Sequence, residues 1–280
     1  MKLISWNIQR GRGLHGTCSI ARVVADLRHM AEFDVLCLQE VSSGYLDLPG
    51  ADGANQFMQL ARLLHGYTPL AGVVTDTLGE GDARLLFGNM IFSRYPVVQV
   101  LRHALPWPAD PAVMSMQRGA IEATLDTPQG LLRVSTAHLE YFSPVQRASQ
   151  VERLRDLHRD ACLHARATPP GDSDNGPFCA VPRALPALLT GDFNFLPDSP
   201  EYRRLQSPFE DGVPPYRDGW RVRHPGLAHA PSVCVHHDSA IPCTFDFIFA
   251  SAELAPRVRE VHVVPGNFGP DHQPLFIELG

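Results

Sequence analysis

Polar side chains follow several apolar, strand-like segments of this sequence, at positions where loops converge on one edge of a sheet. Glu40 follows the apolar residues 35–38, and a carboxylate placed there must be paired, hydrogen-bonded or bound to a metal. Taken alone, Glu40 fits a structural salt bridge equally well. Asn7 and His138 also end apolar segments, although a lone histidine on such a face is more often a hydrogen-bonded core residue.

A carboxylate and an amide lie two residues apart at Asp192 and Asn194. Together they offer an acceptor and a donor to one phosphate, and Gly191 permits a tight turn beside them. Asx residues also make ordinary turns, so this segment alone does not define a site.

Two C-terminal segments suggest a proton-transfer pair. Asp246 lies within the apolar residues 244–249, and His272 follows Asp271 just before the last apolar segment. A buried carboxylate that orients an imidazole forms a general-base dyad. We therefore expect the fold to bring Asp246 and His272 together.

The elements that must position these residues follow from the spacing of apolar side chains, which predicts an α/β protein. Helical spacing covers residues 20–30 and 57–64, and a long helix begins at Ser143-Pro144 and ends before Pro169. Strand-like patterns cover residues 3–8, 34–41, 70–75, 86–93, 97–102, 118–126, 130–139, 187–190, 244–250, 259–264 and 274–279.

Residues 166–186 contain five prolines and a Gly-Asp-Ser-Asp-Asn-Gly run, which suits an interdomain linker or a surface loop. The strand pattern resumes at residue 187, and neither side forms an independent set of elements. We therefore expect one domain over residues 1–280, with a surface loop at about 166–186.

The charge balance argues against a protein that grips nucleic acid by charge alone. The formal net charge is −6, with 24 basic and 30 acidic residues, and Lys2 is the only lysine. Strong non-specific nucleic-acid binding is therefore not expected. This composition does not exclude a phosphate-ester substrate whose charge is balanced locally by a metal ion.

The N-terminal residues 1–7 lack the apolar core of a signal peptide, and no apolar run approaches the roughly 18 to 20 residues of a membrane span. We expect a cytoplasmic monomer with no membrane span.

Five segments, in their order, closely resemble the endonuclease/exonuclease/phosphatase superfamily. This superfamily includes deoxyribonuclease I, exonuclease III-type abasic endonucleases, neutral sphingomyelinases and inositol polyphosphate 5-phosphatases. The matching segments are residues 6–8, 38–41, 191–194, 245–248 and 271–272, joined by 88–96 and 136–139. Pro270 stands where family members commonly have serine.

The resemblance implies a four-layer α/β sandwich, with two mixed β-sheets flanked by helices and the site at one sheet rim. It also implies that Glu40 is the principal Mg²⁺ ligand, with Asn7 and Asp271 nearby and Mn²⁺ able to substitute. Oxygen ligands supplemented by water and substrate phosphate suit such an ion.

The remaining roles come from the same resemblance. It implies that His272, oriented by Asp246, is the general base, and that Asp192 orients or deprotonates the attacking water. Asn194 and His138 would bind phosphate oxygens. Four further candidates for phosphate or substrate binding are Arg118, Asn89, Arg10 and Arg12, although a solvated loop face explains the last two equally well.

Residues 224–243 are rich in histidine and cysteine, which raises the question of zinc. Structural zinc sites show closely spaced ligand pairs, and only Cys234-Val235-His236 approaches that spacing. The sequence does not favour a zinc site here.

The first hypothesis is a Mg²⁺-dependent phosphodiesterase or phosphatase that acts on a small or lipid-like phosphate ester. The alternatives are a DNA or RNA nuclease, and a non-catalytic binding protein that keeps the fold. Because the whole catalytic set is present, the enzyme is favoured. Residues 44–50 and 105–108 could stack a base, hold a lipid head group or simply pack.

Overall fold

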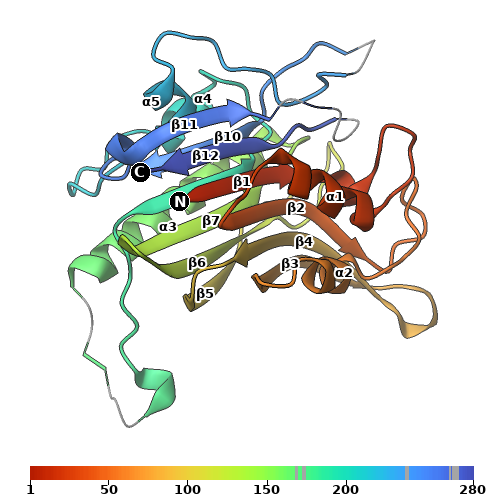
Figure 1. Ribbon diagram of the computed structural model, residues 1–280, viewed down its shortest axis with the longest axis horizontal. Coiled ribbons are helices and arrows are strands. Elements are labelled where there is room, and N and C mark those ends of the chain that lie inside the picture. Colours follow the sequence, from red (N-terminus) through yellow and green to blue (C-terminus); the bar gives the residue numbers. More distant parts are fainter. Residues whose placement is uncertain (168–169, 172–174, 237–239, 265, 267–270) are drawn as a thin grey trace.

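Two mixed six-stranded sheets form the centre of the computed structural model, which describes residues 1–167, 170–171, 175–236, 240–264, 266 and 271–280 (Figure 1). The first sheet has the order β11 (Val258–Val263), β12 (Leu275–Leu279), β1 (Lys2–Asn7), β2 (Val35–Ser43), β4 (Arg84–Ser93) and β3 (Thr68–Leu78). Strand β1 pairs parallel with β2 and antiparallel with β12, so segments from opposite ends of the chain are neighbours.

The second sheet also contains one parallel pair. Its order is β5 (Val97–Ala104), β6 (Gly119–Thr127), β7 (Gly130–His138), β8 (Ala187–Asp192), β10 (Asp246–Ser251) and β9 (Tyr216–Asp218). Strands β7 and β8 run parallel, because α3 (Pro144–Arg166) and the segment after it return the chain to the same edge. The other pairs of this sheet are antiparallel.

The helices begin at residues that cap them. Ser143 accepts a hydrogen bond from the backbone of Gln146, and Pro144 takes the first helical position of α3, as the sequence predicts. Ser19 caps α1 (Ile20–Met30) in the same way, and Asn55 caps α2 (Gln56–Leu63). Two short helices, α4 (Pro200–Leu205) and α5 (Gly219–Arg223), follow β8 and β9.

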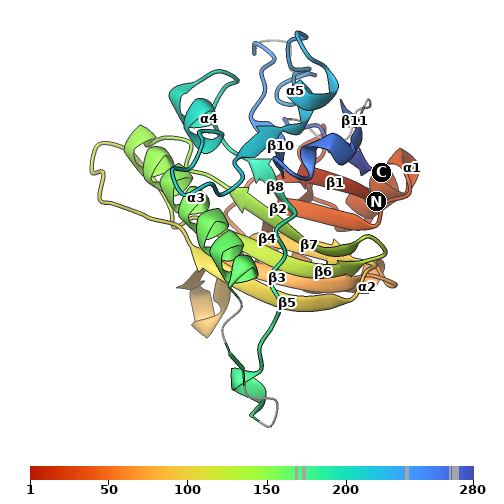
Figure 2. The same cartoon turned by 90° about the vertical axis from the view of Figure 1, so that its left-hand side faces the viewer.

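Three apolar clusters hold the layers together. One lies between the two sheets, where Val35, Ile121 and Ile277 are fully buried. A second joins α1 and α2 to the outer face of the first sheet, and a third joins α3 and α4 to the second sheet. Figure 2 shows α3 along the outer face of the second sheet. The predicted four-layer sandwich is confirmed.

The segment between α3 and β8 carries a short 3₁₀ helix, Gly176–Phe178, which lies away from the sheets in both views (Figures 1 and 2). Residues 168–169 and 172–174 of the predicted loop lie outside the described residues. Within the described ranges, no helix combines the length and apolar character that crossing a membrane requires.

A buried charged cluster lies between the second sheet and α3. Arg133 is 1% exposed and donates to Glu122 over 3.1 Å. Its Nη2 also lies 3.0 Å from Nδ1 of His158, whose Nε2 faces the carbonyl oxygen of Pro214 at 2.8 Å. Burial and the Arg133 charge lower the pKa of His158 to about 4. His158 is therefore neutral at physiological pH, with Nδ1 accepting and Nε2 donating.

This histidine should make folding stability depend on pH. Because the pKa of His158 lies below the ordinary 6.5, the unfolded chain binds a proton first, so stability is full above pH 6.5 and falls as pH drops toward 4. The loss at pH 5 should be roughly 2 kcal/mol. Urea unfolding at pH 7.5 and 5.0 measures it: His158→Gln should reduce the difference by that amount, and the exposed control His65→Gln should not. An equal difference in wild type and His158→Gln would contradict this assignment.

Candidate active site

Three strands of the second sheet place polar side chains side by side. Asp192, the last residue of β8, pairs with His138 of β7 and with Asp246 of β10. Directly opposite residues on neighbouring strands point to the same face of a sheet. The register therefore gathers His138, Asp192 and Asp246 at one rim, as the strand-end argument predicts.

Gly191 makes this rim possible by its lack of a side chain. It lies within β8 with a φ of 138°, and a Cβ added there would come 1.8 Å from the carbonyl oxygen of Ala137. The predicted tight turn at Gly191 is wrong. Glycine is needed because β7 and β8 approach closely beside Asp192.

The first sheet contributes Asn7 and Glu40. Asn7 ends β1, whereas Glu40 lies inside β2, which continues to Ser43, two residues beyond the predicted end at residue 41. The register of β2 shifts between Leu38 and Val41, and Glu40 has a φ of 58°. Such a bulge re-aims a side chain next to a functional site.

Asn7 connects the two sheets. Its Nδ2 donates to Glu40 Oε1 and to Asp192 Oδ2, each over 3.0 Å. Because an amide nitrogen carries two protons, one side chain satisfies both carboxylates. Glu40 and Asp192, from different sheets, are thereby held on either side of Asn7.

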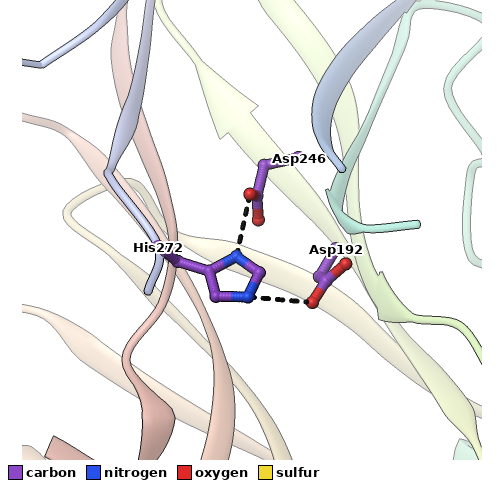
Figure 3. Close-up of side chains that lie close together, drawn as sticks. All are labelled: Asp192, Asp246 and His272. Atoms are coloured by element: carbon purple, nitrogen blue, oxygen red, sulfur yellow. Dashed lines mark hydrogen bonds and ion pairs between the residues drawn. The ribbon is translucent and has the colours of Figure 1, made fainter. Parts of the chain in front are cut away.

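His272 lies between two carboxylates (Figure 3). Its Nδ1 is 2.9 Å from Asp246 Oδ2, and its Nε2 is 3.6 Å from Asp192 Oδ2. Asp246 Oδ2 also accepts the hydroxyl of Ser232 over 2.7 Å, and the indole of Trp6 donates to the backbone carbonyl of His272. The imidazole is therefore fixed from both ends.

Burial and charge set the protonation of this group. Burial alone would lower the pKa of His272, but Asp246 and Asp192 outweigh it and raise that pKa. Burial raises the pKa of Asp192, while His272 opposes the rise. Nδ1 donates to Asp246 and Nε2 faces the Asp192 carboxylate at 3.6 Å, so His272 carries the proton at neutral pH.

His138 and Asn194 complete this end of the site. His138 Nε2 lies 3.4 Å from Asp192 Oδ2, which supplies the carboxylate partner that the sequence could not place. Its Nδ1 is buried without a hydrogen-bond partner, and burial, Arg118 and His272 hold its pKa well below the usual range. Asn194 has a φ of 52°; its backbone N–H donates to Asp192, and its amide donates to the carbonyl of Leu139.

Glu40, Asp271 and Gln9 offer oxygen atoms suited to a metal. Asp271 accepts a hydrogen bond from Gln9 Nε2, while Oε1 of Gln9 is buried without a partner. The guanidinium of Arg10 lies 2.9 Å from the other oxygen of Glu40. Carboxylate and amide oxygens are the ligands that Mg²⁺ prefers, so the donor set fits such an ion.

The four further phosphate-binding candidates occupy different places. Arg10 and Arg118 line a cavity that also contains Asp192 and His272 in its lining. Arg118 Nε donates to Glu140 over 3.2 Å. Asn89 is buried and donates to the carbonyl of Gly119, and its placement fits a structural contact between β4 and β6. Among the described lining residues, neither Asn89 nor Arg12 is present.

These polar residues open into a cavity of about 790 Å³. Its apolar walls include Tyr45 and Leu48, which belong to the first loop that the sequence singled out, and also Phe87. Tyr141 and Phe142 form another wall that sequence reasoning missed, since they follow His138 as ordinary residues before a helix start. The sequence feature that could have identified them is a pair of adjacent aromatic residues shortly after a candidate site residue.

The described histidines of residues 224–243 have separate partners. His224 contacts the carbonyl of Val261, and His229 contacts Asp218. His237 lies outside the described residues. Across the part of the chain that the structure describes, the one group of three or more potential ligands close enough to share a metal is Asp192, Asp246 and His272.

Comparisons with known proteins agree with this geometry. The model of the endonuclease/exonuclease/phosphatase family matches residues 4–272. No curated protein matches the chain by sequence. An endonuclease/exonuclease/phosphatase from Beutenbergia cavernae is 25% identical, with a TM-score of 0.68 over 100% of this chain and 72% of that one.

Two other solved structures share the fold. A mannosyl-6-phosphatase from Bacteroides thetaiotaomicron is 17% identical, with a TM-score of 0.69 over 100% of this chain and 99% of that one. A 3′ phosphatase from Neisseria, bound to a product DNA hairpin, is 20% identical, with a TM-score of 0.62 and the same coverage.

Proposed function

Because this chain belongs to the endonuclease/exonuclease/phosphatase family, a family of phosphoric ester hydrolases, we propose that it hydrolyses small phosphate esters with the help of Mg²⁺. The observation that carries this proposal is the buried group of Asp192, His272 and Asp246, of which Asp192 and His272 line the cavity. The complete catalytic set argues against a non-catalytic binding protein. That the protein acts as a cytoplasmic monomer stays a prediction.

Asp192 and His272 are the proposed proton-transfer groups. A water molecule beside Asp192 Oδ2 and His272 Nε2 would attack phosphorus, and its proton would pass to this pair as the ester P–O bond breaks. With His272 protonated, Asp192 is the available acceptor, and the rise in its pKa brings it closer to neutral pH. Asp246 holds the imidazole and stabilises its charge.

Glu40, Asn7 and Asp271 are the residues that would hold the metal. A bound Mg²⁺ would supply charge for the phosphate and lower the pKa of a water. The trio of Asp192, Asp246 and His272 suits a cation less well, because Nδ1 of the imidazole already bonds Asp246 over 2.9 Å and Nε2 faces the Asp192 carboxylate at 3.6 Å.

Asn194, His138 and Arg118 are the proposed phosphate-binding residues. All three line the cavity next to Asp192. His138 is neutral, and its ring lies beside Asp192, where a phosphate oxygen would bind. Arg118 bonds Glu140 through Nε, and a guanidinium carries four further donors.

Charge favours a small ester over DNA. Among the described residues that line the cavity, the arginines are Arg10 and Arg118, and both are paired, Arg10 with Glu40 and Arg118 with Glu140. The chain carries a net charge of −6. Binding to a duplex depends on releasing counterions from many phosphates. The nuclease therefore stays the alternative.

A substrate panel tests this function. With Mg²⁺ or Mn²⁺, bis-p-nitrophenyl phosphate should be hydrolysed. Excess chelator should abolish the reaction, because no cation then balances the negative charge of the phosphate. Plasmid DNA, abasic DNA, sphingomyelin and inositol phosphates complete the panel. Full activity in chelator would exclude the metal, and plasmid nicking at the rate of the best small ester would establish the nuclease.

A further inference from the structure

We propose that the cavity contains a second subsite, an aromatic wall formed by Tyr141, Phe142 and Phe245, which binds a flat ring carried on the alcohol portion of the ester. This proposal rests on the phosphoesterase function above, because it uses the position of the phosphate at Asp192. It narrows the substrate class to phosphate esters of ring-bearing alcohols.

The wall lies beside the reacting groups. Tyr141 and Phe142 come three and four residues after His138, and Phe245 directly precedes Asp246. All three aromatic residues line the same cavity as Asp192 and His272. A group attached to a phosphate at Asp192 can therefore reach the wall without a long linker.

The rings are packed against one another yet remain accessible. Tyr141 meets Phe142 at 4.9 Å and Phe245 at 6.2 Å, with interplanar angles of 90° and 70°. Tyr141 is nevertheless 53% exposed and Phe142 44%. Exposed aromatic side chains grouped at a cavity mark a binding surface, and their edge-to-face packing leaves ring faces open to another ring.

Glu140 fixes the backbone of this wall. It is fully buried, and its Oε1 accepts the N–H of Phe142 over 2.9 Å. Arg147 donates to the carbonyl oxygens of Glu140 and Tyr141 over 3.0 and 2.9 Å. A wall already held in place loses little conformational freedom when a ligand binds.

The same carboxylate fixes the distance between wall and phosphate. Glu140 Oε2 accepts from Arg118 over 3.2 Å, while Oε1 holds Phe142. A phosphate bound at Arg118 and a ring bound at Tyr141 would therefore be positioned by one buried side chain. Glu140 is thus a positioning residue for both ends of the ligand.

The shape and charge of the cavity favour a ring over an acyl chain or a polymer. Its volume of about 790 Å³ falls in the range of small-ligand sites. Another aromatic pair, Tyr45 and Phe87 at 6.5 Å and 89°, contributes to its lining. The faces and edges of these rings interact favourably with a flat π-system. A flexible acyl chain would be stabilised only by the burial of apolar area.

Matched esters test the subsite. Benzyl phosphate and cyclohexylmethyl phosphate release primary alcohols of similar acidity and size, so they differ mainly in the flatness of the ring. Their methyl diesters serve if the protein prefers diesters. With Mg²⁺, kcat/KM measured by alcohol release should favour the benzyl ester about threefold to tenfold, the range expected of aromatic pairs.

The wall variants show whether this preference arises at Tyr141. Tyr141→Ala and Tyr141→Leu should both bring the benzyl preference close to unity, and the leucine should retain more of kcat/KM because it keeps apolar area. Phe178→Ala is the matched control, since Phe178 is an aromatic residue 69% exposed on the remote 3₁₀ helix. Its preference should equal that of wild type.

The outcomes separate the two proposals. If neither ester of any pair is hydrolysed with Mg²⁺ or Mn²⁺, the phosphoesterase proposal fails. If both are hydrolysed with equal kcat/KM, or the saturated ring is preferred, the catalytic proposal stands and the aromatic subsite is overturned. A benzyl preference that survives in Tyr141→Ala also overturns the assignment to this wall.

Discussion

Replacing His272 by alanine should lower kcat by roughly 10²- to 10⁴-fold, the contribution of a general acid–base group. The reason is its position between Asp246 and Asp192, where its charge would support the carboxylate proposed to accept the proton of the attacking water. Metal dependence should change little, because His272 contacts Asp246 and Asp192, whereas Glu40, Asn7 and Asp271 are the proposed metal ligands. Steady-state kinetics at saturating Mg²⁺ measures this.

Asp246→Asn should also lower kcat, since an amide can favour the wrong tautomer and cannot offset the charge of the protonated ring. If Asp246 acts only through His272, the double variant should be about as slow as His272→Ala alone. A double variant slower by the full Asp246→Asn factor would show that Asp246 acts elsewhere, for example through Ser232.

A second buried pair, formed by Asp218 of β9 and His229 of the loop after α5, provides the control. His229 Nε2 lies 2.5 Å from Asp218 Oδ2, and both side chains are nearly inaccessible. Because neither residue lines the cavity among its described residues, His229→Ala should cost stability but leave kcat per folded molecule near wild type. A kcat loss equal to that of His272→Ala would indicate general damage to the sheet.

Replacing Glu40 by glutamine should raise the Mg²⁺ concentration needed for half-maximal activity by at least about tenfold, because a weak neutral ligand replaces a charged one. Arg10→Gln should shift it in the opposite direction, since Arg10 occupies one oxygen of Glu40 and competes with a cation for it. Activity titrated with Mg²⁺ measures both shifts. Arg12→Gln, in the same loop, is the matched control.

The informative result is that Glu40→Gln and Arg10→Gln shift the required Mg²⁺ concentration in opposite directions. If both variants need more Mg²⁺, Arg10 orients Glu40 toward the metal and does not compete with it. If neither variant changes the Mg²⁺ requirement, Glu40 is a structural partner of Arg10, which is the alternative that its sequence position left open.

Strong local patterns made most of the fold predictable. Alternating or continuous apolar residues gave β1, β2 and β12, and Ser143-Pro144 gave the start of α3 within one residue. The short elements α4, β9 and α5 were missed, because three to six residues cannot establish a period. Strand β10 begins at Asp246, two residues later than predicted.

The site, like the fold, was predictable where local sequence patterns are strong and unpredictable where long-range contacts decide. Strand ends indicated Asn7, His138 and Asp192 individually, but no sequence pattern specified that Asn7 would bridge Glu40 and Asp192 across two sheets. The bulge at Glu40 was also invisible, because its cause lies in the pairing of β2 with β4. Long-range contacts such as Arg118 with Glu140 depend on the packed structure.

The pairing of β1 with β12 also bears on how the protein is made. Lys2 aligns with Glu278, so the sheet that carries Asn7 is completed by a strand from the other end of the chain. Contacts of such high sequence separation form late and slow folding. During synthesis, which proceeds from the N-terminus, Asn7 and Glu40 emerge from the ribosome long before His272. The proposed active site would therefore be incomplete in the nascent chain until β12 pairs with β1.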